Sequence, residues 1–205
     1  MSNHALSPQF GDIDIYLFDQ LLRGRISPGM RVFDAGCGSG RNLVYLLQAG
    51  FDVYAADANA DAVRAVRALA ARLAPHLPAD HFRHEPLDAL TFDSQFADVV
   101  ISSAVLHFAE DDRQFAAMLE GSWRRLAPGG LFFCRLASSI GIETLVRPLA
   151  GRRHHLPDGS DRYLVDEALL MEWTTRLGGQ LLDPIKTTVV QNQRAMTTWV
   201  VRNQR

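Results

Sequence analysis

The sequence contains a single lysine, Lys186, and only two cysteines, Cys37 and Cys134. Two cysteines are too few for a disulfide-stapled secreted scaffold or a thiolate metal cluster, so we expect reduced thiols. No run approaches the ~20 apolar residues that a membrane span requires. The N-terminal stretch lacks the basic start and apolar core of a secretory signal. We therefore expect a cytoplasmic protein without a membrane partner.

Neither sign of charge dominates the chain. Its 21 lysines and arginines are opposed by 23 aspartates and glutamates, which gives a formal net charge of -2. A nucleic-acid-binding surface is usually strongly basic, so this balance counts against a nucleic-acid partner. Hydrophobic residues make up 47% of the 205 residues, which is typical of a globular domain with a full core. We expect one domain over residues 1–205.

Strand and helix patterns alternate through most of the chain. Apolar or β-branched runs predict strands, and amphipathic spacing predicts helices. The predicted strands are 30–35, 51–57, 81–85, 97–102 and 131–136, and the predicted helices are 12–24, 41–48, 110–126, 166–177 and one capped by Asn59 or Asp61 that runs to Leu73. Such alternation is typical of an α/β fold with a mostly parallel sheet and right-handed crossovers.

The end of the chain departs from this alternation. Two runs rich in β-branched residues, Ile185–Val190 and Met196–Val201, are separated only by 191–195. This connection is too short for a parallel crossover, so it predicts an antiparallel hairpin. Residues 1–28 are predicted as an N-terminal helical segment, and residues 138–165 as a lid over an acceptor site.

The stretch Val32–Gly40, VFDAGCGSG, is the clearest motif. An apolar strand ends in an acid, three glycines follow at alternate positions, and a helix-like pattern begins at once. In this architecture backbone N–H groups converge on a ligand beside a helix N-terminus, and glycine permits the close approach. The motif alone predicts a ligand without identifying it.

Polar side chains follow the later strands at places that a ligand over the glycine turn would reach. Asp57 ends the second strand, where a carboxylate can bond both hydroxyls of a ribose. Asp88 follows the third strand and can accept a hydrogen bond from an exocyclic amine. The fourth strand ends at Ser102, beside the glycine turn.

Together the stretches VFDAGCGSG, AAD, LDALTF, FADVVISSAVLHF and LAPGGLFF resemble the motif series of the class I S-adenosylmethionine-dependent methyltransferases. The resemblance covers residues 30–136. It implies a Rossmann-like three-layer fold with a seven-stranded sheet in the order 3-2-1-4-5-7-6, strand 7 being antiparallel. It also implies S-adenosylmethionine as the cofactor. The implied cofactor contacts are Asp34, Gly36, Cys37, Gly38, Gly40, Asp57, Ala58, Leu87, Asp88, Ala89 and Ser102.

A narrower stretch, GSGRN followed by LVYLLQAGFDVYAAD, is similar to the tellurite-resistance methyltransferase branch. The rival interpretation is a nicotinamide-binding domain, which also carries an acid after its second strand. That fingerprint is GxGxxG, whereas here the third glycine comes one position early and Arg41 stands in its place. The terminal hairpin also counts against this rival, so we favour the methyltransferase interpretation.

Transfer of an activated methyl group depends mainly on holding the acceptor close and collinear, and it needs a base only for a protonated nucleophile. His107 is the candidate base by position, with packing against the next helix as the alternative. Tyr16 is expected either to cover the cofactor or acceptor, or simply to pack. Arg153 and Tyr163, from the arginine-rich segment 138–165, are candidates together with His107 for binding a polar or anionic small-molecule acceptor.

We expect no metal site. His81 and His84 are three residues apart on a strand and point to opposite faces, and His154 and His155 lack a third ligand. Two functions stay open: a small-molecule methyltransferase, and a non-catalytic regulator or subunit that binds the same cofactor. The sequence also leaves a monomer and a homodimer open.

Overall fold

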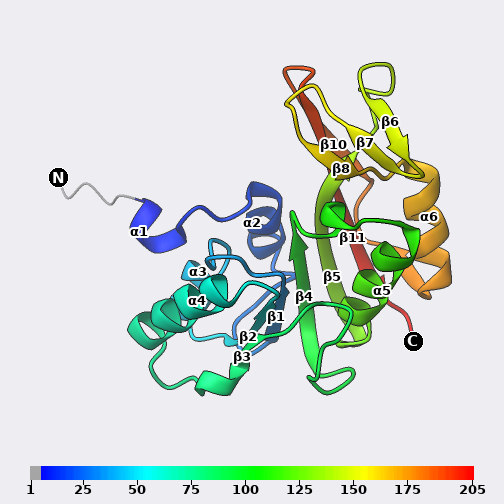
Figure 1. The fold of residues 1–205 in the computed structure, drawn as a ribbon. Coiled ribbons are helices and arrows are strands. Elements are labelled where there is room, and N and C mark those ends of the chain that lie inside the picture. Colours follow the sequence, from blue (N-terminus) through cyan, green and yellow to red (C-terminus); the bar gives the residue numbers. More distant parts are fainter. Residues whose placement is uncertain (1–5) are drawn as a thin grey trace.

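The computed structural model of the chain describes residues 6–205. Its helices are α1 (Leu6–Phe10), α2 (Ile15–Leu22), α3 (Val44–Gln48), α4 (Ala60–Leu73), α5 (Asp112–Trp123) and α6 (Glu167–Arg176), with 3-10 turns at Ala79–His81 and Leu106–Phe108 (Figure 1). Its strands are β1 (Arg31–Ala35), β2 (Asp52–Asp57), β3 (Phe82–His84), β4 (Ala97–Ser103), β5 (Leu126–Ser138), β6 (Arg147–Ala150), β7 (Arg153–His155), β8 (Asp161–Tyr163), β9 (Gly179–Leu181), β10 (Lys186–Val190) and β11 (Arg194–Asn203).

The central sheet has the strand order β10-β11-β5-β4-β1-β2-β3. Its pairings from β3 across to β5 are parallel, whereas β11 runs antiparallel to both β5 and β10. The short strand β9 also pairs with β11, further along it than β10. The order agrees with the one that the resemblance implied, and the predicted terminal hairpin is confirmed.

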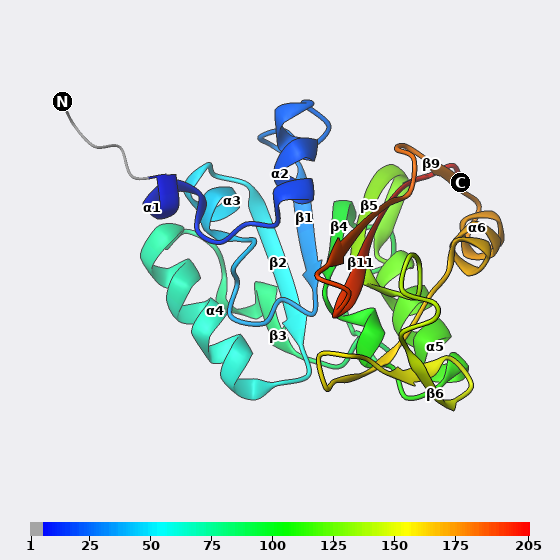
Figure 2. The same ribbon diagram turned by 90° about the horizontal axis from the view of Figure 1, so that it is seen from above.

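Side chains of the central strands alternate between two helical layers. Val32 and Val99 pack in one core with α2, α3 and α4, whereas Phe33 and Val100 pack in another with α5 and α6. Figure 2 shows α3 and α4 on one side of the sheet and α5 and α6 on the other. This three-layer arrangement confirms the predicted Rossmann-like fold class.

Side-chain caps determine where the long helices begin. The Asn59 side chain accepts a hydrogen bond from a backbone amide at the start of α4, and Asp111 and Asp166 do so at α5 and α6. Such caps each stabilise a helix by about 1 kcal/mol. Within residues 6–205, no helix is long and apolar enough to cross a membrane.

The helix predicted over residues 110–126 ends earlier than expected. α5 stops at Trp123, and Leu126 instead begins β5, where it pairs with Ala97 and is fully buried. Pairing in the sheet satisfies the backbone of Leu126 and buries its side chain at the same time. The strand therefore extends back through Pro128–Gly130, ahead of the predicted strand 131–136.

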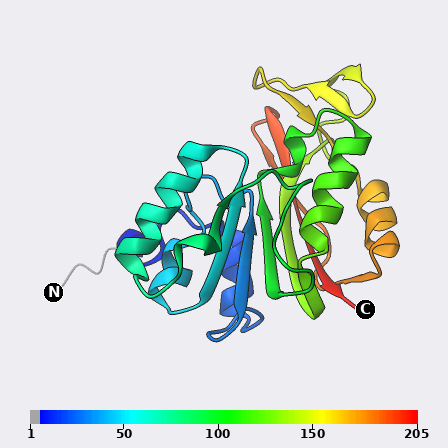
Figure 3. The ribbon, with the colours of Figure 1, turned by 60° about the horizontal axis from the view of Figure 1, so that its bottom comes forward.

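The predicted lid, residues 138–165, contains a small antiparallel sheet of β6, β7 and β8 that the sequence pattern did not indicate. Figures 1 and 3 show this sheet beyond the ends of the central strands, near the tip of the β10–β11 hairpin. β8 contacts β5 and the Leu106–Phe108 turn that follows β4. The segment therefore lies at the end of the sheet where ligands of open α/β folds bind.

Candidate functional site

A cavity of about 500 Å³ lies at the carboxyl ends of β1, β2 and β4. Small-molecule sites typically have volumes of roughly 300–1,000 Å³. The cavity is lined by Gly36, Cys37, Gly38, Ser39, Arg41, Asn42, Asp57, Ala58, Pro86, Leu87, Asp88, Ser103, Ala104, Val105, Phe108, Gln114 and Met118. It therefore gathers the segments that follow four neighbouring parallel strands, together with two residues of α5.

The glycine turn forms one wall of this cavity. Gly36 has a φ of +84°, and a Cβ there would lie 2.5 Å from a methyl group of Val105, so the position requires glycine. The amides of Gly36 and Cys37 donate to the Ala56 carbonyl at 2.9 and 3.1 Å, which holds the turn against β2. At Gly38 a Cβ would meet no atom within 4 Å. Gly38 is therefore the position at which the turn leaves room for a ligand.

Asp57 stands opposite the glycine turn at the end of β2. Its Oδ2 accepts a hydrogen bond from the Gly38 amide and its Oδ1 accepts one from the Asn59 amide, both at 2.8 Å. An ionised carboxylate accepts about four hydrogen bonds, so each oxygen retains capacity for a ligand. Because both existing bonds come from the backbone, the carboxylate is held in one orientation and can accept from two adjacent hydroxyls.

Four of the predicted cofactor residues do not line the cavity. Asp34 and Ser102 are buried behind it, where Asp34 Oδ2 and Ser102 Oγ have no hydrogen-bond partner among the described residues. Gly40 faces α4 instead, because a Cβ there would approach two of the helix's side chains at 3.0 and 3.1 Å. Ala89 is exposed outside the cavity. The other seven predicted residues all line it.

Burial raises the pKa of Asp34 to about 7, the nearby Asp57 carboxylate adds to the rise, and the Arg41 guanidinium opposes it. A carboxyl group with this pKa is only partly ionised at neutral pH. Asp34 does not line the cavity, and the two acids that do are Asp57 and the exposed Asp88.

An ionic network around the buried Asp14 connects α2 to the cavity, and no sequence pattern predicted it. The fully buried carboxylate of Asp14 accepts a hydrogen bond from Arg135 Nη1 at 2.9 Å and lies 3.8 Å from Arg41 Nη2. Arg41 also donates to Ser103 Oγ at 2.9 Å, and Asn42 Oδ1 accepts from the Asp14 amide at 3.0 Å. Arg41, Asn42 and Ser103 all line the cavity, so Asp14 positions part of its wall.

Tyr16 serves as a tie between elements and does not line the cavity. Its hydroxyl lies 2.8 Å from Thr188 Oγ1, which joins α2 to β10. The Arg135 guanidinium lies over its ring, 5.7 Å from the ring centroid. The structure therefore supports packing for Tyr16, one of the two roles that the sequence left open.

His107 is buried in the turn after β4. Its Nδ1 accepts a hydrogen bond from the Ala137 amide at 3.1 Å, so the neutral ring carries its proton on Nε2. Burial, aided by the Arg162 charge, lowers the pKa of His107 to about 4. A ring whose unprotonated nitrogen is engaged and whose pKa is low is a poor general base at neutral pH. The geometry therefore argues against the catalytic role considered for His107.

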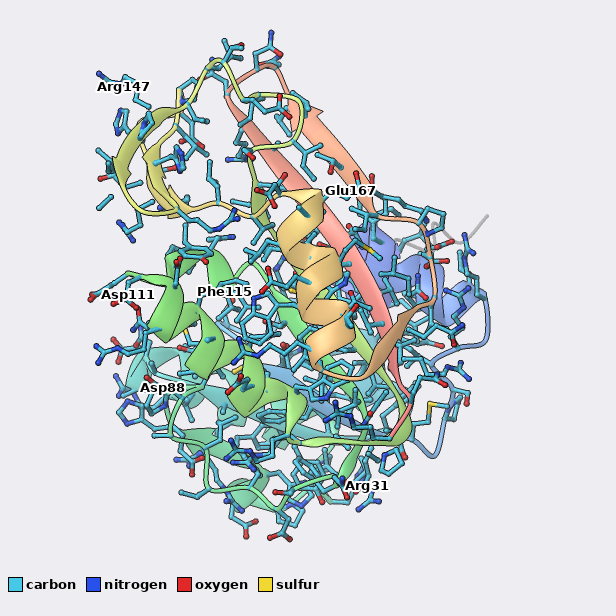
Figure 4. The ribbon with its side chains drawn as sticks, turned by 90° about the vertical axis from the view of Figure 1, so that its right-hand side faces the viewer. Arg31, Asp88, Asp111, Phe115, Arg147 and Glu167 are labelled. Atoms are coloured by element: carbon cyan, nitrogen blue, oxygen red, sulfur yellow. The ribbon has the colours of Figure 1, made fainter. Side chains whose placement is uncertain are left out.

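Arg153 and Tyr163 hold the small sheet against the core. Arg153 Nη1 donates to the Ala109 carbonyl at 3.0 Å. Tyr163 is 1% exposed, its ring stacks on Phe115 at 4.6 Å, and its hydroxyl donates to Asp112 at 2.9 Å. Figure 4 shows Phe115 between α5 and α6, so Tyr163 belongs to the core at that junction. Packing therefore accounts for both residues, which were considered for acceptor binding.

Cys37 lines the cavity, but burial raises the pKa of its thiol and leaves it un-ionised. A thiol of this kind is a poor nucleophile, so Cys37 acts as a small residue in a tight turn. Across residues 6–205, no group of three or more histidines, cysteines or acids is arranged to hold a metal ion.

Comparison with known proteins points to one family. A family model described as a methyltransferase domain matches residues 33–134. The uncharacterized methyltransferase sll0829 of Synechocystis is 33% identical over 107 residues, which are 52% of this chain and 47% of the relative. The cypemycin N-terminal methyltransferase of a Streptomyces species is 32% identical over 105 residues, 51% of this chain and 41% of the relative. Each match thus spans less than half of the relative's length.

Solved structures resemble nearly the whole chain. The 1,6-didemethyltoxoflavin-N1-methyltransferase of Burkholderia thailandensis, with bound 1,6-didemethyltoxoflavin and S-adenosylhomocysteine, has a TM-score of 0.71 and 18% identity, covering 95% of this chain and 80% of that one. The magnesium protoporphyrin IX methyltransferase of Synechocystis, with bound S-adenosylmethionine, has a TM-score of 0.65 and 19% identity, covering 92% and 77%. At these identities the likeness establishes the shared fold.

Proposed function

Because the chain belongs to the class I S-adenosylmethionine-dependent methyltransferase family, we propose that it transfers a methyl group to a small-molecule acceptor. The observation that carries this proposal is the cavity in which the glycine turn, Asp57 and Asp88 meet. When bound there, S-adenosylmethionine supplies a methyl group whose carbon–sulfur electron pair stays on sulfur as the acceptor's electron pair forms the new bond.

The residues of the cavity fit this cofactor. The open space at Gly38 would admit the methionine part against the backbone, and the Arg41 guanidinium would pair with its carboxylate. The free acceptor capacity of Asp57 suits the two ribose hydroxyls. Leu87 and Asp88 would hold the adenine, the first by apolar contact and the second by accepting from its amino group.

In this proposal the protein contributes positioning more than proton transfer. His107 is a poor base, so a protonated acceptor would have to release its proton to water. The network around Asp14 fixes Arg41 and Ser103, while Phe108 and Met118 add apolar wall to the cavity. Holding the reactants in line can by itself supply roughly 7–11 kcal/mol of the barrier reduction.

The volume of the site, about 500 Å³, is in the range of small-molecule sites and supports a small acceptor. The segment 138–165 folds over the end of the sheet, and we propose that it serves as a lid within a single methyltransferase domain over residues 1–205. Two of the structural relatives are named for small-molecule acceptors. We propose a monomer or homodimer that acts without nucleic acid, in keeping with the net charge of -2.

Substitution of Asp57 tests the cofactor site. Hydrogen bonds to a charged group contribute about 1.5–3 kcal/mol, so Asp57→Asn should weaken S-adenosylhomocysteine binding at least about tenfold by calorimetry. Asp61→Asn, an exposed acid in the first turn of α4, is the matched control and should bind like the wild type. Equal binding by both variants would remove Asp57 from the site. No binding by the wild type would defeat the proposed function.

A turnover assay separates catalysis from the non-catalytic alternative. Wild-type protein is incubated with S-adenosylmethionine and a panel of thiols, amines and carboxylic acids, and release of S-adenosylhomocysteine is measured. Acceptor-dependent release at a rate above that of the Asp57→Asn variant supports the enzyme. Tight cofactor binding without such release would favour a regulator or subunit.

A further inference from the structure

A second cavity, of about 270 Å³, adjoins the first. Ala104, immediately after β4, lines both cavities. The walls of the second cavity come from β5, from β8 and the turn before it, from the β10–β11 hairpin, and from His107 in the turn after β4. The two cavities therefore meet at the end of the strand that separates them, as a cofactor site and an acceptor site must.

Three arginines from three different strands line the second cavity: Arg135 of β5, Arg162 of β8 and Arg194 of β11. Asp158 is the single acid of the lining, and it lies 3.8 Å from Arg194. Three guanidinium groups against one carboxylate leave the lining with an excess of two positive charges. Asp14, which pairs with Arg135, is itself also faced by Arg41, so it does not remove this excess.

The arginines retain donors for a ligand. A guanidinium has five N–H donors, and Arg135 uses only Nη1 in a side-chain hydrogen bond among the described residues. Arg162 uses Nη1 for the Asp161 carbonyl, and its guanidinium lies 4.8 Å from the ring centroid of Phe108, which lines the first cavity. Stacking on Phe108 holds Arg162 at the junction of the two cavities.

The remainder of the lining is largely apolar. Leu156, Val190 and Met196 contribute to it from the β7–β8 turn and from both strands of the hairpin. Val190 is 36% exposed although it belongs to a strand, so it offers apolar surface that the protein itself leaves uncovered. Charge at one part of the cavity and apolar surface at another suit a ligand that combines both.

The backbone at the junction is strained. Ala104 has a φ of +64°, the left-handed conformation, which costs an L-residue other than glycine roughly 1–2 kcal/mol. Its amide donates to the Arg135 carbonyl at 2.7 Å, which ties the strained residue to the arginine strand. Such strain concentrates at ligand sites, and here it falls on the residue common to both cavities.

We propose that the second cavity binds the methyl acceptor, and that this acceptor carries an oxyanion, a carboxylate or a phosphate, on an apolar frame. Arg162 and Arg194 bind the oxyanion, and Leu156 and Met196 contact the frame. The reactive atom then faces the first cavity past Ala104. The inference rests on the proposed function, since only a methyl donor in the first cavity makes the second one an acceptor site.

The test measures binding of simple probes to protein saturated with S-adenosylhomocysteine. Benzoate and phenyl phosphate represent the two oxyanions, and benzamide is their neutral counterpart. We expect at least one anion to bind tenfold or more tightly than benzamide by calorimetry. The double variant Arg162→Gln/Arg194→Gln should lose this preference, whereas Arg113→Gln, an exposed arginine of α5, should retain it.

Asp158→Asn supplies a test of opposite sign. The substitution removes the carboxylate that opposes the arginines, so it should tighten binding of the anion several-fold. The hydrogen bonds that the Ser160 amide and hydroxyl donate to the side-chain oxygen can persist. Circular dichroism and an unchanged affinity for S-adenosylhomocysteine establish that each variant is folded. The affinity for S-adenosylhomocysteine is an independent control because Arg162, Arg194 and Asp158 all lie outside the first cavity.

The anion site is overturned by equal binding of anion and amide, by failure of both anions to bind, or by a double variant that keeps the preference. Failure of the proposed function has a different signature. In that case S-adenosylhomocysteine does not bind, or no acceptor is methylated, while the anion preference, measured on the protein without S-adenosylhomocysteine, and its loss in the double variant persist.

Discussion

Replacing Asp14 by asparagine should destabilise the protein while keeping its shape. The Asp14 side chain is fully buried, caps α2 through the Tyr16 amide at 3.0 Å, and pairs with Arg135 at 2.9 Å. Asparagine retains an oxygen for the cap but not the charge. The substitution therefore isolates the ionic part of the interaction, and Asp14→Ala removes the cap as well.

The structure sets the size of the effect. Removing one partner of a buried ion pair costs about 3–5 kcal/mol. Arg135 keeps 21% of its side chain exposed, and water there offsets part of the loss, so we expect about 2–3 kcal/mol for Asp14→Asn. Loss of an N-cap adds about 1 kcal/mol for Asp14→Ala. At about 2–4 °C per kcal/mol for a chain of this length, Asp14→Asn should lower Tm by about 4–12 °C.

Urea unfolding followed by circular dichroism measures the change, with Asp12→Asn as the control. Asp12 is exposed two residues away and should change stability by no more than about 0.5 kcal/mol. Affinity for S-adenosylhomocysteine should also fall in Asp14→Asn, because Arg41 and Ser103 lose their common partner. If Asp14→Asn matches Asp12→Asn in both measurements, the network neither stabilises the fold nor positions the cavity wall.

Two further predictions concern pH. The pKa of Asp34 is raised to about 7, so the folded state holds more protons than the unfolded chain between about pH 4 and 7. The folded state therefore loses stability as pH rises through that window. Asp34→Asn should remove this loss, and urea titrations at pH 8 should show it up to about 4 kcal/mol more stable than the wild type. The pKa of His107 is lowered to about 4, so the unfolded chain holds more protons than the folded state between about pH 4 and 6.5, and stability falls as pH falls through that window. His107→Gln should flatten this loss, which is at most about 3 kcal/mol. A stability–pH curve of the variant that runs parallel to that of the wild type would contradict the lowered pKa of His107.

Local patterns were sufficient to predict most of the fold. Alternating strands and helices gave the parallel sheet, and the short connection between β10 and β11 gave the antiparallel hairpin. The strands of the small sheet, β6 to β8, were not predictable in the same way. They have three or four residues each and show no alternation of buried and exposed side chains, so their pairing arises from tertiary contact.

Seven of the eleven residues predicted to contact the cofactor line the first cavity, and the end of the fourth strand shows how a neighbouring residue was missed. β4 runs through Ser103, one position beyond the predicted end. Because successive side chains on a strand face opposite sides, this difference decides which serine reaches the cavity. Ser102 is buried behind it, whereas Ser103 bonds Arg41 and lines it. The sequence indicated the correct strand end but not the face on which each side chain lies.

The sequence contained a signal for the capping role of Asp14 but none for its ionic partner. An acid before an apolar helical run is a typical N-cap, and Asp14 is the N-cap of α2. Its ionic partner Arg135 is 121 residues away in the sequence. In a chain with arginine at nearly every cationic position, no pattern singles out one of them, so the pairing could be found only in the folded structure.

The two cavities also differ in how far the match to known methyltransferases covers them. The first cavity is built from consecutive strand–loop units, and all of its lining residues lie within residues 33–134, where the family model matches. Arg135, Arg162 and Arg194 all lie beyond that match, on strands that only the fold brings together. Sequence similarity to methyltransferases thus constrains the methyl donor. In our proposal the choice of acceptor depends on charges that the matched region does not contain, so a relative that shares only that region need not share the acceptor.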